Sequence, residues 1–429
     1  MKDGTKEISF IIPVRGQWEL TENCLRSLAK HSSVHSYEVI VVDNASADAT
    51  ATRLLPLGRA LFGESFSLIR NPENRNFGPA CNQGARAAAS PLLFFLNNDT
   101  LLTPGWLPPL LQALRDEAEL GAVGPLLLYT DNTVQHLGVT YSSGGLAHLY
   151  KGYPLAHPVT GRFRHVQALT GAALLLPANL FFDCGSFCEE YRNGFEDVEL
   201  SLRLGARGYK LRCVSASIVY HLESRTPGRA DHEEHNSLKL KERCLHMLRQ
   251  DTHLHALRDS FAPALDDSLG VSVLLRESDS ADLARQARKY IPDLLRINEL
   301  LEANPGWLTG YLWLGRLAEE SGERELALRY AFMACAQRLS FENIENALRL
   351  ASIQERNVAK FDATLRELLG KLTRLYSGPD PEIVRLYKKS LATALERGDT
   401  EMIRLLEEKE AEIDKNIIRL SQAGQAGQN

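Results

Sequence analysis

Several features that mark particular classes of protein are missing from this sequence. No apolar run reaches the ~20 residues of a membrane-spanning helix, and the longest candidate, residues 168–182, is interrupted by Gly171 and Pro177. Residues 8–14 are too short for a signal-peptide core. The seven cysteines are scattered and form no CxxC pair, so we interpret them as reduced thiols. We therefore expect a cytoplasmic protein with no transmembrane segment, which leaves docking at a membrane surface open.

The chain also lacks a charge excess and the common nucleotide-binding or hydrolase signatures. Its 49 basic and 54 acidic residues give a net charge of -5, which does not favour a nucleic-acid partner. Walker, GxSxG and GxGxxG motifs are absent. With 429 residues, 44% hydrophobic, the chain has the composition of a globular protein of two or three domains.

The first hundred residues alternate between strand and helix patterns. Short apolar runs predict buried strands at 8–14, 38–42, 66–70 and 92–96, separated by helical segments at 18–30, from 48 and at 79–89. This order predicts an α/β fold with a mostly parallel sheet and helices on both faces. Polar residues follow three strands, namely Arg15, Asp43 and Asp99. Ligands bind at the carboxyl ends of strands in such sheets, so we expect the site there. Residues 141–165 have the composition of a long loop that could cover a site.

Each polar motif allows a functional and a purely structural interpretation. Asp99, in Asn97-Asn98-Asp99, could bind a hard divalent cation or only cap a turn. In Glu196-Asp197-Val198-Glu199, a carboxylate could act as general base, or all three could favour a helix N-terminus. Asp43 could bind a nucleotide base or ribose, or form an Asx-turn. Arg75 could meet phosphate in a loop that otherwise only starts a helix, and His221 could complete a metal site or be structural.

The order of these motifs resembles that of the family 2 glycosyltransferases, most closely a bacterial rhamnosyltransferase-like branch. The resemblance covers roughly residues 7–226 and rests on Ile11-Ile12-Pro13-Val14, Val41-Val42-Asp43-Asn44-Ala45-Ser46, Asn74-Arg75-Asn76-Phe77-Gly78, Leu96-Asn97-Asn98-Asp99-Thr100, Pro104-Gly105-Trp106-Leu107, Thr170-Gly171-Ala172, Phe195-Glu196-Asp197-Val198-Glu199-Leu200 and Tyr220-His221.

This resemblance implies a GT-A fold and an inverting, metal-dependent transfer of a sugar from a UDP- or dTDP-sugar. Asp197 matches the catalytic base, with Glu196 beside it. Asp99 matches the last aspartate of the D-x-D motif and would bind Mn²⁺ or Mg²⁺ with His221, whereas Asn97 replaces the first aspartate and removes one anionic ligand. Thr170 and Gly171 would face the acceptor. The nucleotide-sugar would contact Pro13, Arg15, Asp43, Asn44, Ser46, Arg75, Asn76, Gly78, Asn82 and Asn98.

The C-terminal half changes to a helical pattern. Residues 311–318 with Ala327, Ala331 and Ala334 resemble one tetratricopeptide repeat, and further helices are expected at 343–353, 358–375, 381–396 and 401–420. We expect a catalytic domain at 1–230, a helical linker at 231–260, an all-α repeat-like domain at 261–420 and a disordered tail at 421–429. The helical domain could recruit a protein partner, or only stabilise or dimerise the enzyme.

Two functions of different classes fit these motifs. The first is a glycosyltransferase whose acceptor is a glycan or a protein, for example a surface polysaccharide or a flagellar protein. The second is a catalytically silent sugar-nucleotide-binding scaffold whose helical half binds a partner. Asn97 is compatible with the scaffold, whereas Asp99 and the Glu196-Asp197 pair favour the enzyme.

Overall fold

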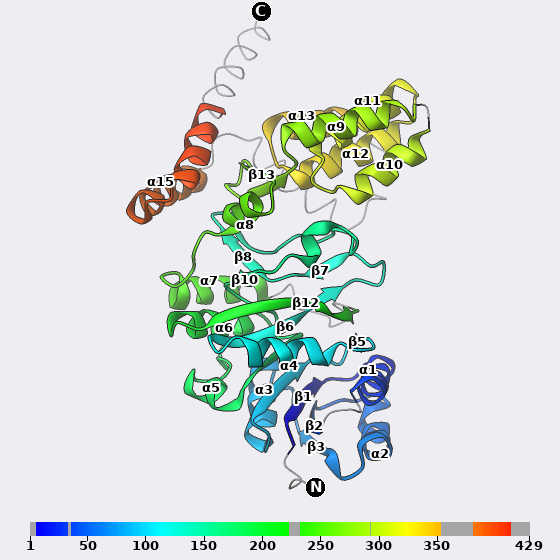
Figure 1. Cartoon of the computed structure of the whole chain (residues 1–429), viewed down its shortest axis with the longest axis vertical. Coiled ribbons are helices and arrows are strands. Elements are labelled where there is room, and N and C mark those ends of the chain that lie inside the picture. The colour runs from blue at the N-terminus through cyan, green and yellow to red at the C-terminus, as the bar shows by residue number, and fades with distance from the viewer. Residues whose placement is uncertain (1–5, 33–35, 223–231, 292, 353–380, 413–429) are drawn as a thin grey trace, which may run out of the picture. The chain divides into compact units, whose positions relative to one another are not determined.

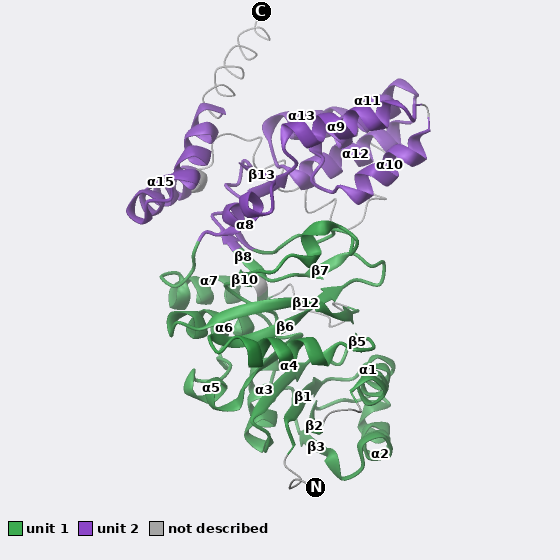
Figure 2. Cartoon of the chain, viewed as in Figure 1, with its two compact units in different colours: residues 1–140, 147–249 green, residues 141–146, 250–429 purple. Residues whose placement is uncertain are grey.

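A computed structural model describes residues 6–32, 36–222, 232–291, 293–352 and 381–412. They belong to two compact units (Figures 1 and 2). Unit 1 comprises residues 1–140 and 147–249, and unit 2 comprises residues 141–146 and 250–429.

A ten-stranded mixed sheet forms the centre of unit 1. Six of its strands share one direction: β1 (Ile8–Val14), β2 (Tyr37–Asn44), β3 (Phe66–Asn71), β4 (Leu92–Leu96), β6 (Leu120–Leu128) and β12 (Lys210–His221). The reversed strand β11 (Ala173–Pro177) lies between β4 and β6, in the order β10-β12-β6-β11-β4-β1-β2-β3. Three short strands complete the sheet: β5 (Thr100–Leu102), β7 (Val134–His136) and β10 (His165–Val166).

Helices cover both faces of this sheet because the side chains of β1 alternate between two apolar layers. Phe10 and Ile12 belong to a buried cluster with residues of α1 (Trp18–His31), α2 (Thr50–Phe62) and α4 (Leu107–Asp116). Ile11 points the other way, toward α3 (Phe77–Ala87), where a Cβ on Gly84 would come within 2.5 Å of it. Ring contacts of Phe95 with Phe181 attach α5 (Ala178–Asp183). The predicted α/β class with a mostly parallel sheet is confirmed.

The remaining elements of unit 1 include two helices near the end of the unit, α6 (Glu196–Ala206) and α7 (Glu233–Cys244). A 3-10 turn, η1 (Gly63–Ser65), precedes β3. The prediction of one long loop at 141–165 is wrong. In this region β8 (Val139–Ser142) and β9 (Gly145–His148) pair as a hairpin, and η2 (Pro158–Gly161) follows. Gly145, with φ 117°, allows the tight reversal between the two strands.

The longer part of unit 2, from residue 250, begins with α8 (Thr252–Arg258) and a hairpin of β13 (Ala262–Leu265) and β14 (Val271–Leu274). This hairpin corrects the expectation of an all-α region, and Asp266 stabilises its turn by accepting hydrogen bonds from the Ser268 and Gly270 amides. Helices follow as α9 (Glu277–Arg288), α10 (Leu294–Ala303), α11 (Leu308–Glu320), α12 (Arg324–Gln337), α13 (Phe341–Ser352) and α15 (Pro381–Arg397), and residues 400–412 are also helical.

Helices α11 and α12 pack closely through small residues. A Cβ on Gly315 would lie 3.6 Å from the Cβ of Tyr330, and Ala327, Ala331 and Ala334 are buried. The tetratricopeptide resemblance stays a prediction. The helix expected at 358–375 and the tail at 421–429 lie outside the described residues.

The predicted domain boundaries also stay a prediction. Of the linker expected at residues 231–260, the part up to residue 249, with α7, falls in unit 1 and the rest falls in unit 2. No helix in the described part of the chain is long and apolar enough to cross a membrane.

Candidate active site

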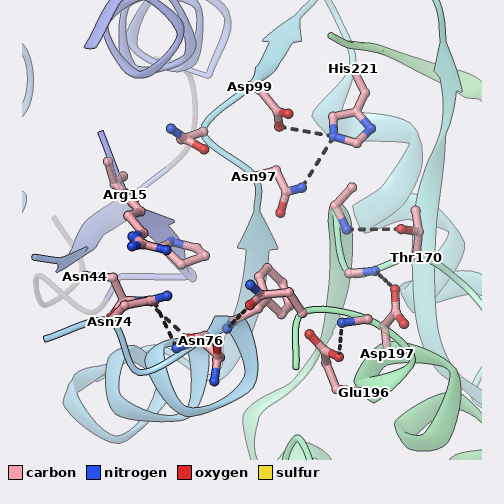
Figure 3. A pocket seen from close by; sticks show the side chains of 18 of the residues that line it. Arg15, Asn44, Asn74, Asn76, Asn97, Asp99, Thr170, Glu196, Asp197 and His221 are labelled. Atoms are coloured by element: carbon pink, nitrogen blue, oxygen red, sulfur yellow. Dashed lines mark hydrogen bonds and ion pairs between the residues drawn. The ribbon is translucent and has the colours of Figure 1, made fainter. Parts of the chain in front are cut away.

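A pocket in unit 1 opens where β1, β2, β4 and β12 end (Figure 3). In this view Arg15 and Asn44 lie on one side of it, and Thr170 and Asp197 lie on the other. The lining consists of Pro13, Val14, Arg15, Gln17, Asn44, Asn74, Asn76, Phe77, Asn97, Asn98, Asp99, Thr170, Gly171, Ala172, Asn193, Gly194, Phe195, Glu196, Asp197 and His221.

Asp99 and His221 meet at the back of this pocket because β5 pairs antiparallel with β12, with His221 opposite Thr100. Asp99 Oδ1 lies 3.1 Å from His221 Nε2, and Asn97 Nδ2 lies 3.3 Å from the same nitrogen. On its other side, His221 Nδ1 is 2.7 Å from Gln135 Oε1. If Nδ1–H donates to this oxygen, Nε2 keeps its lone pair and faces the pocket.

This pair fits the first ligands of a divalent cation. An unprotonated Nε2 and a carboxylate oxygen are both acceptors, and a cation between them would remove their repulsion. Two adjacent octahedral ligands about 2.1 Å from one ion lie about 3.0 Å apart, close to the observed separation. Among the described residues, no group of three or more His, Cys, Asp or Glu side chains could hold a metal by itself. Substrate oxygens would therefore have to complete the coordination, as is common for Mg²⁺.

Asp197 presents a fixed carboxylate from the first turn of α6. Its Oδ2 accepts a hydrogen bond from the Gly171 amide at 2.7 Å, and its Oδ1 accepts one from the Val198 amide at 2.8 Å. Glu196, 3% exposed, instead accepts from the Gly194 amide at 2.7 Å. An ionised carboxylate has about four acceptor positions, so Asp197 retains capacity for a hydroxyl proton.

Glu199 is turned away from the pocket. It is 2% exposed and accepts hydrogen bonds from Arg243, at 3.0 Å for the Nη2–Oε1 pair. Glu199 therefore joins α6 to α7 through an ion pair.

Behind Thr170 lies a pair of histidines, His136 and His148. The Thr170 amide lies 3.4 Å from His136 Nε2, and His136 Nδ1 lies 2.8 Å from His148 Nδ1. Burial, followed by the nearby charges of His148 and His221, lowers the pKa of His136 well below 6.5. Since His136 is 1% exposed, it remains a neutral support of the Thr170–Gly171 loop.

The opposite wall carries Arg15 and several amide side chains. Asn44 Nδ2 donates to the Asn76 carbonyl at 3.1 Å, and Asn74 Oδ1 accepts from the Asn76 amide at 3.1 Å. These contacts connect the end of β2 to the turn before α3. Arg15 is exposed, and no hydrogen bond or ion pair joins its guanidinium to another described residue.

Eleven of the predicted site residues line the pocket, and five do not. Those that line it are Pro13, Arg15, Asn44, Asn76, Asn98, Asp99, Thr170, Gly171, Glu196, Asp197 and His221. Those outside the lining are Asp43, Ser46, Arg75, Gly78 and Asn82.

Four of these five residues shape the walls. Asp43 Oδ1 accepts from the Ser46 amide, and Ser46 Oγ accepts from the Gly16 amide at 2.7 Å, next to Arg15. Asn82, 2% exposed, hydrogen-bonds both the amide and the carbonyl of Phe187. Gly78 allows α3 to approach the Cys188 carbonyl, which a Cβ would reach at 3.1 Å.

Sequence reasoning missed Gln17, Asn193 and Phe195. All three line the pocket in left-handed backbone conformations, with φ of 58°, 55° and 75°. Strained residues of this kind gather at functional sites. Asn193-Gly194 is a dipeptide typical of turns, whereas Gln17 and Phe195 carry no sequence signal for their conformation.

Comparison with known proteins shows that part of the chain is similar in sequence to one family. Residues 9–152 match the model of Glycosyl transferase family 2. The O-antigen biosynthesis protein RfbC of Myxococcus xanthus is 32% identical over 52% of this chain and 18% of its own length. The uncharacterized protein y4gI of Sinorhizobium fredii is 28% identical over 54% of this chain and 26% of its own length. The chain therefore spans only a minor part of both relatives.

Two further similarities come from shorter or more distant proteins. The N-acetylglucosaminyl-diphospho-decaprenol L-rhamnosyltransferase of Mycobacterium tuberculosis is 27% identical over 44% of this chain and 68% of its own length. Among solved structures, the mannosyltransferase PcManGT of Pyrobaculum calidifontis, in complex with GDP-Man and Mn²⁺, aligns with 82% of this chain and 88% of its own at 16% identity and a TM-score of 0.43. On the family match and the sequence relatives, residues 9–152 of unit 1 are similar to the family 2 glycosyltransferases.

Proposed function

We propose that unit 1 is the catalytic part of an inverting glycosyltransferase. It moves a sugar from a UDP- or dTDP-sugar to a hydroxyl of a glycan or protein acceptor in the cytoplasm, with Mn²⁺ or Mg²⁺. The observation that carries this proposal is the convergence of three groups on one pocket: the Asp99–His221 pair, the fixed carboxylate of Asp197, and Arg15.

Charge in the pocket supports the need for a cation. Arg15 is opposed by three lining carboxylates, Asp99, Glu196 and Asp197, so the lining carries a formal charge of -2 with His221 neutral. A diphosphate would be repelled by this lining alone. A divalent ion bound by Asp99 and His221 would offset the repulsion and stabilise the charge of the leaving diphosphate.

Asp197 is suited to act as the base of a single displacement. Its two backbone hydrogen bonds fix the direction of both oxygens, so the acceptor hydroxyl meets a carboxylate that need not reorganise. Holding donor and acceptor in line across the pocket would supply much of the rate enhancement. Inversion requires one base and one stabilised leaving group, and the pocket offers both.

The relatives suggest where to begin with substrates. Two of them are named for O-antigen biosynthesis and for L-rhamnose transfer to a lipid-linked sugar. A donor panel should therefore include UDP-hexoses and dTDP-linked L-rhamnose. The helical unit is proposed to bind a protein acceptor, a partner enzyme or a second copy of the chain.

The competing function is a silent scaffold that binds sugar nucleotides without turning them over. Calorimetry with UDP, dTDP, GDP and CDP, with and without Mn²⁺ or Mg²⁺, combined with nucleoside-diphosphate release from the donor panel, separates the two. The enzyme should bind UDP or dTDP in a metal-dependent manner and release it from one of the donors. Binding without release would favour the scaffold, and no binding by the folded chain would refute both.

Asp197→Asn tests the base directly. The carboxamide can keep one backbone hydrogen bond but turns an NH₂ group toward the other amide donor. We expect metal-dependent binding to persist and turnover to be abolished. Asp99→Asn should instead weaken the metal-dependent binding. The matched control is Asp183→Asn, an exposed carboxylate at the end of α5, which should change neither.

A further inference from the structure

The turn before α6 is held in an unfavourable backbone conformation. Asn193, Gly194 and Phe195 have φ of 55°, 156° and 75°. Glycine and asparagine adopt such backbone readily, but it costs Phe195 roughly 1–2 kcal/mol, so the surrounding structure must impose it there. Phe195 directly precedes the first residue of α6. Its conformation therefore sets the direction in which the first turn of α6 presents Asp197.

Asn236, on α7, binds the backbone beside this turn. Its Oδ1 accepts from the Arg192 amide at 3.1 Å, and its Nδ2 donates to the Arg192 carbonyl at 3.1 Å. The side chain is 2% exposed, and a Cβ on Gly194 would lie 3.6 Å from its Nδ2. Asn236 does not line the pocket. It therefore contacts the turn without contacting the substrate site.

Helix α7 is itself anchored to α6, which lies beside it (Figure 1). Arg243 forms an ion pair with the buried carboxylate of Glu199, close to Asp197 on the first turn of α6. Arg243 is 41% exposed, but its loss would take an ion-pair partner from a carboxylate that is 2% exposed, which favours keeping the two helices together. Lys239 also pairs with Glu190, but Glu190 is exposed, so this pair adds little to the anchoring. Asn236 thus projects from a helix whose position is fixed relative to Asp197.

We propose that Asn236 is a positioning residue for sugar transfer. It holds Arg192, and through it the turn at 193–195, so that Asp197 is directed at the acceptor hydroxyl. The segment expected to be a linker then has a role in the active site. The kinetic part of this inference rests on the proposed transferase function.

The kinetic test uses the full chain with Asn236→Ala. Both backbone groups of Arg192 lose their partner, the turn can relax, and Asp197 is misdirected. A misplacement of about 1 Å can lower a rate on the order of a hundredfold, so we expect kcat to fall by about that factor. The Kd for UDP or dTDP with Mn²⁺ should not change, because Arg15, Asp99 and His221 lie on other elements.

Two further variants separate positioning from a general loss of structure. Asn236→Asp keeps an acceptor for the Arg192 amide but loses the donor to its carbonyl, so kcat should lie between those of wild type and Asn236→Ala. Lys239→Ala removes another contact of the same helix, while Glu190 keeps Arg243 as a partner. Its kcat should equal that of wild type. Equal losses of kcat, nucleotide affinity and thermal stability in Asn236→Ala and Lys239→Ala would overturn the proposal.

Amide hydrogen exchange provides a readout that does not depend on activity. Asn236→Ala should accelerate exchange in the peptide that contains residues 191–195, and Lys239→Ala should not. Unchanged exchange in Asn236→Ala would overturn the proposal that Asn236 stabilises the turn. Faster exchange with an unchanged kcat would overturn the proposal that the turn directs Asp197. If the wild type turns over no donor, the proposed function fails, while the exchange result still supports or overturns the hold on the turn.

Discussion

Replacing Gly171 by alanine tests how closely Asp197 must be positioned. A Cβ at this residue would lie 3.2 Å from two ring atoms of Phe77 and 3.3 Å from the Cβ of Asp197. The Phe77 ring is supported by Phe187, with ring centroids 5.8 Å apart, and so has little room to move. The methyl group must therefore shift Asp197 by a few tenths of an ångström, or lengthen its 2.7 Å hydrogen bond to the Gly171 amide.

We expect two measurable effects of Gly171→Ala. Overpacking costs about 1–3 kcal/mol in general, and the contacts here are mild, so the free energy of unfolding should fall by about 1 kcal/mol. The displaced base should lower kcat about tenfold, which corresponds to about 1.4 kcal/mol in the barrier. Donor turnover and urea unfolding of the purified chain measure the two quantities.

Gly205→Ala on α6 is the matched control for Gly171→Ala. No atom lies within 4 Å of the added methyl group. Alanine favours a helix by about 1 kcal/mol over glycine, so this variant should be slightly more stable, with unchanged kcat. A folded Gly171→Ala variant with wild-type kcat would refute the assignment of Asp197 as a closely positioned base.

Two further predictions concern pH and packing. Because burial lowers the pKa of His136, this histidine is protonated in the unfolded chain before it is protonated in the folded one, as the pH falls below about 6.5. Below that pH, this residue should lower the free energy of unfolding by up to about 1.4 kcal/mol per pH unit. Urea unfolding at pH 7.5 and 5.5 should therefore show a smaller fall in this free energy for His136→Gln than for wild type. Equal falls in the two proteins would contradict the lowered pKa of His136. Gly58→Ala on α2 should destabilise by about 1–3 kcal/mol, against the usual helix preference, because its Cβ would come within 2.2 Å of the Phe66 ring; a thermal unfolding midpoint at or above that of wild type would show that the ring moves freely.

The sequence predicts the first half of the sheet well because its strands are short, fully apolar and separated by amphipathic helices. Those expected at 8–14 and 92–96 agree with β1 and β4 to the residue. The polar residues that follow each strand locate the pocket, since parallel strands direct their carboxyl ends to one edge. The hairpin of β8 and β9 was missed because its short strands contain polar residues and glycines, which are typical of loops.

The Asp99–His221 pair could be expected only through the family resemblance. The two residues are 122 positions apart in the sequence, and their approach depends on β5, a strand of three residues. A three-residue strand has no periodicity to recognise. The conformation of Phe195 is hidden for another reason, because tertiary contacts around the turn at 193–195, such as those of Asn236, impose it against local preference.

Polar residues near a site look alike in sequence whether they contact a ligand or support a loop. Asp43, Ser46 and Asn82 were predicted to bind the nucleotide sugar, which stays a prediction; in the structure each also accepts or donates hydrogen bonds that fix the backbone of a neighbouring segment. The hydrogen bonds from the Ser46 amide to Asp43 and from the Gly16 amide to Ser46 end beside Arg15, the one arginine in the lining. Several residues that line the pocket thus follow the strand ends, while the adjacent polar side chains fix the loops that carry them. If Arg15 contacts the donor as proposed, Ser46 supports that contact through the Gly16 amide, and Ser46→Ala should raise the Kd for UDP or dTDP, measured by calorimetry, more than it lowers kcat.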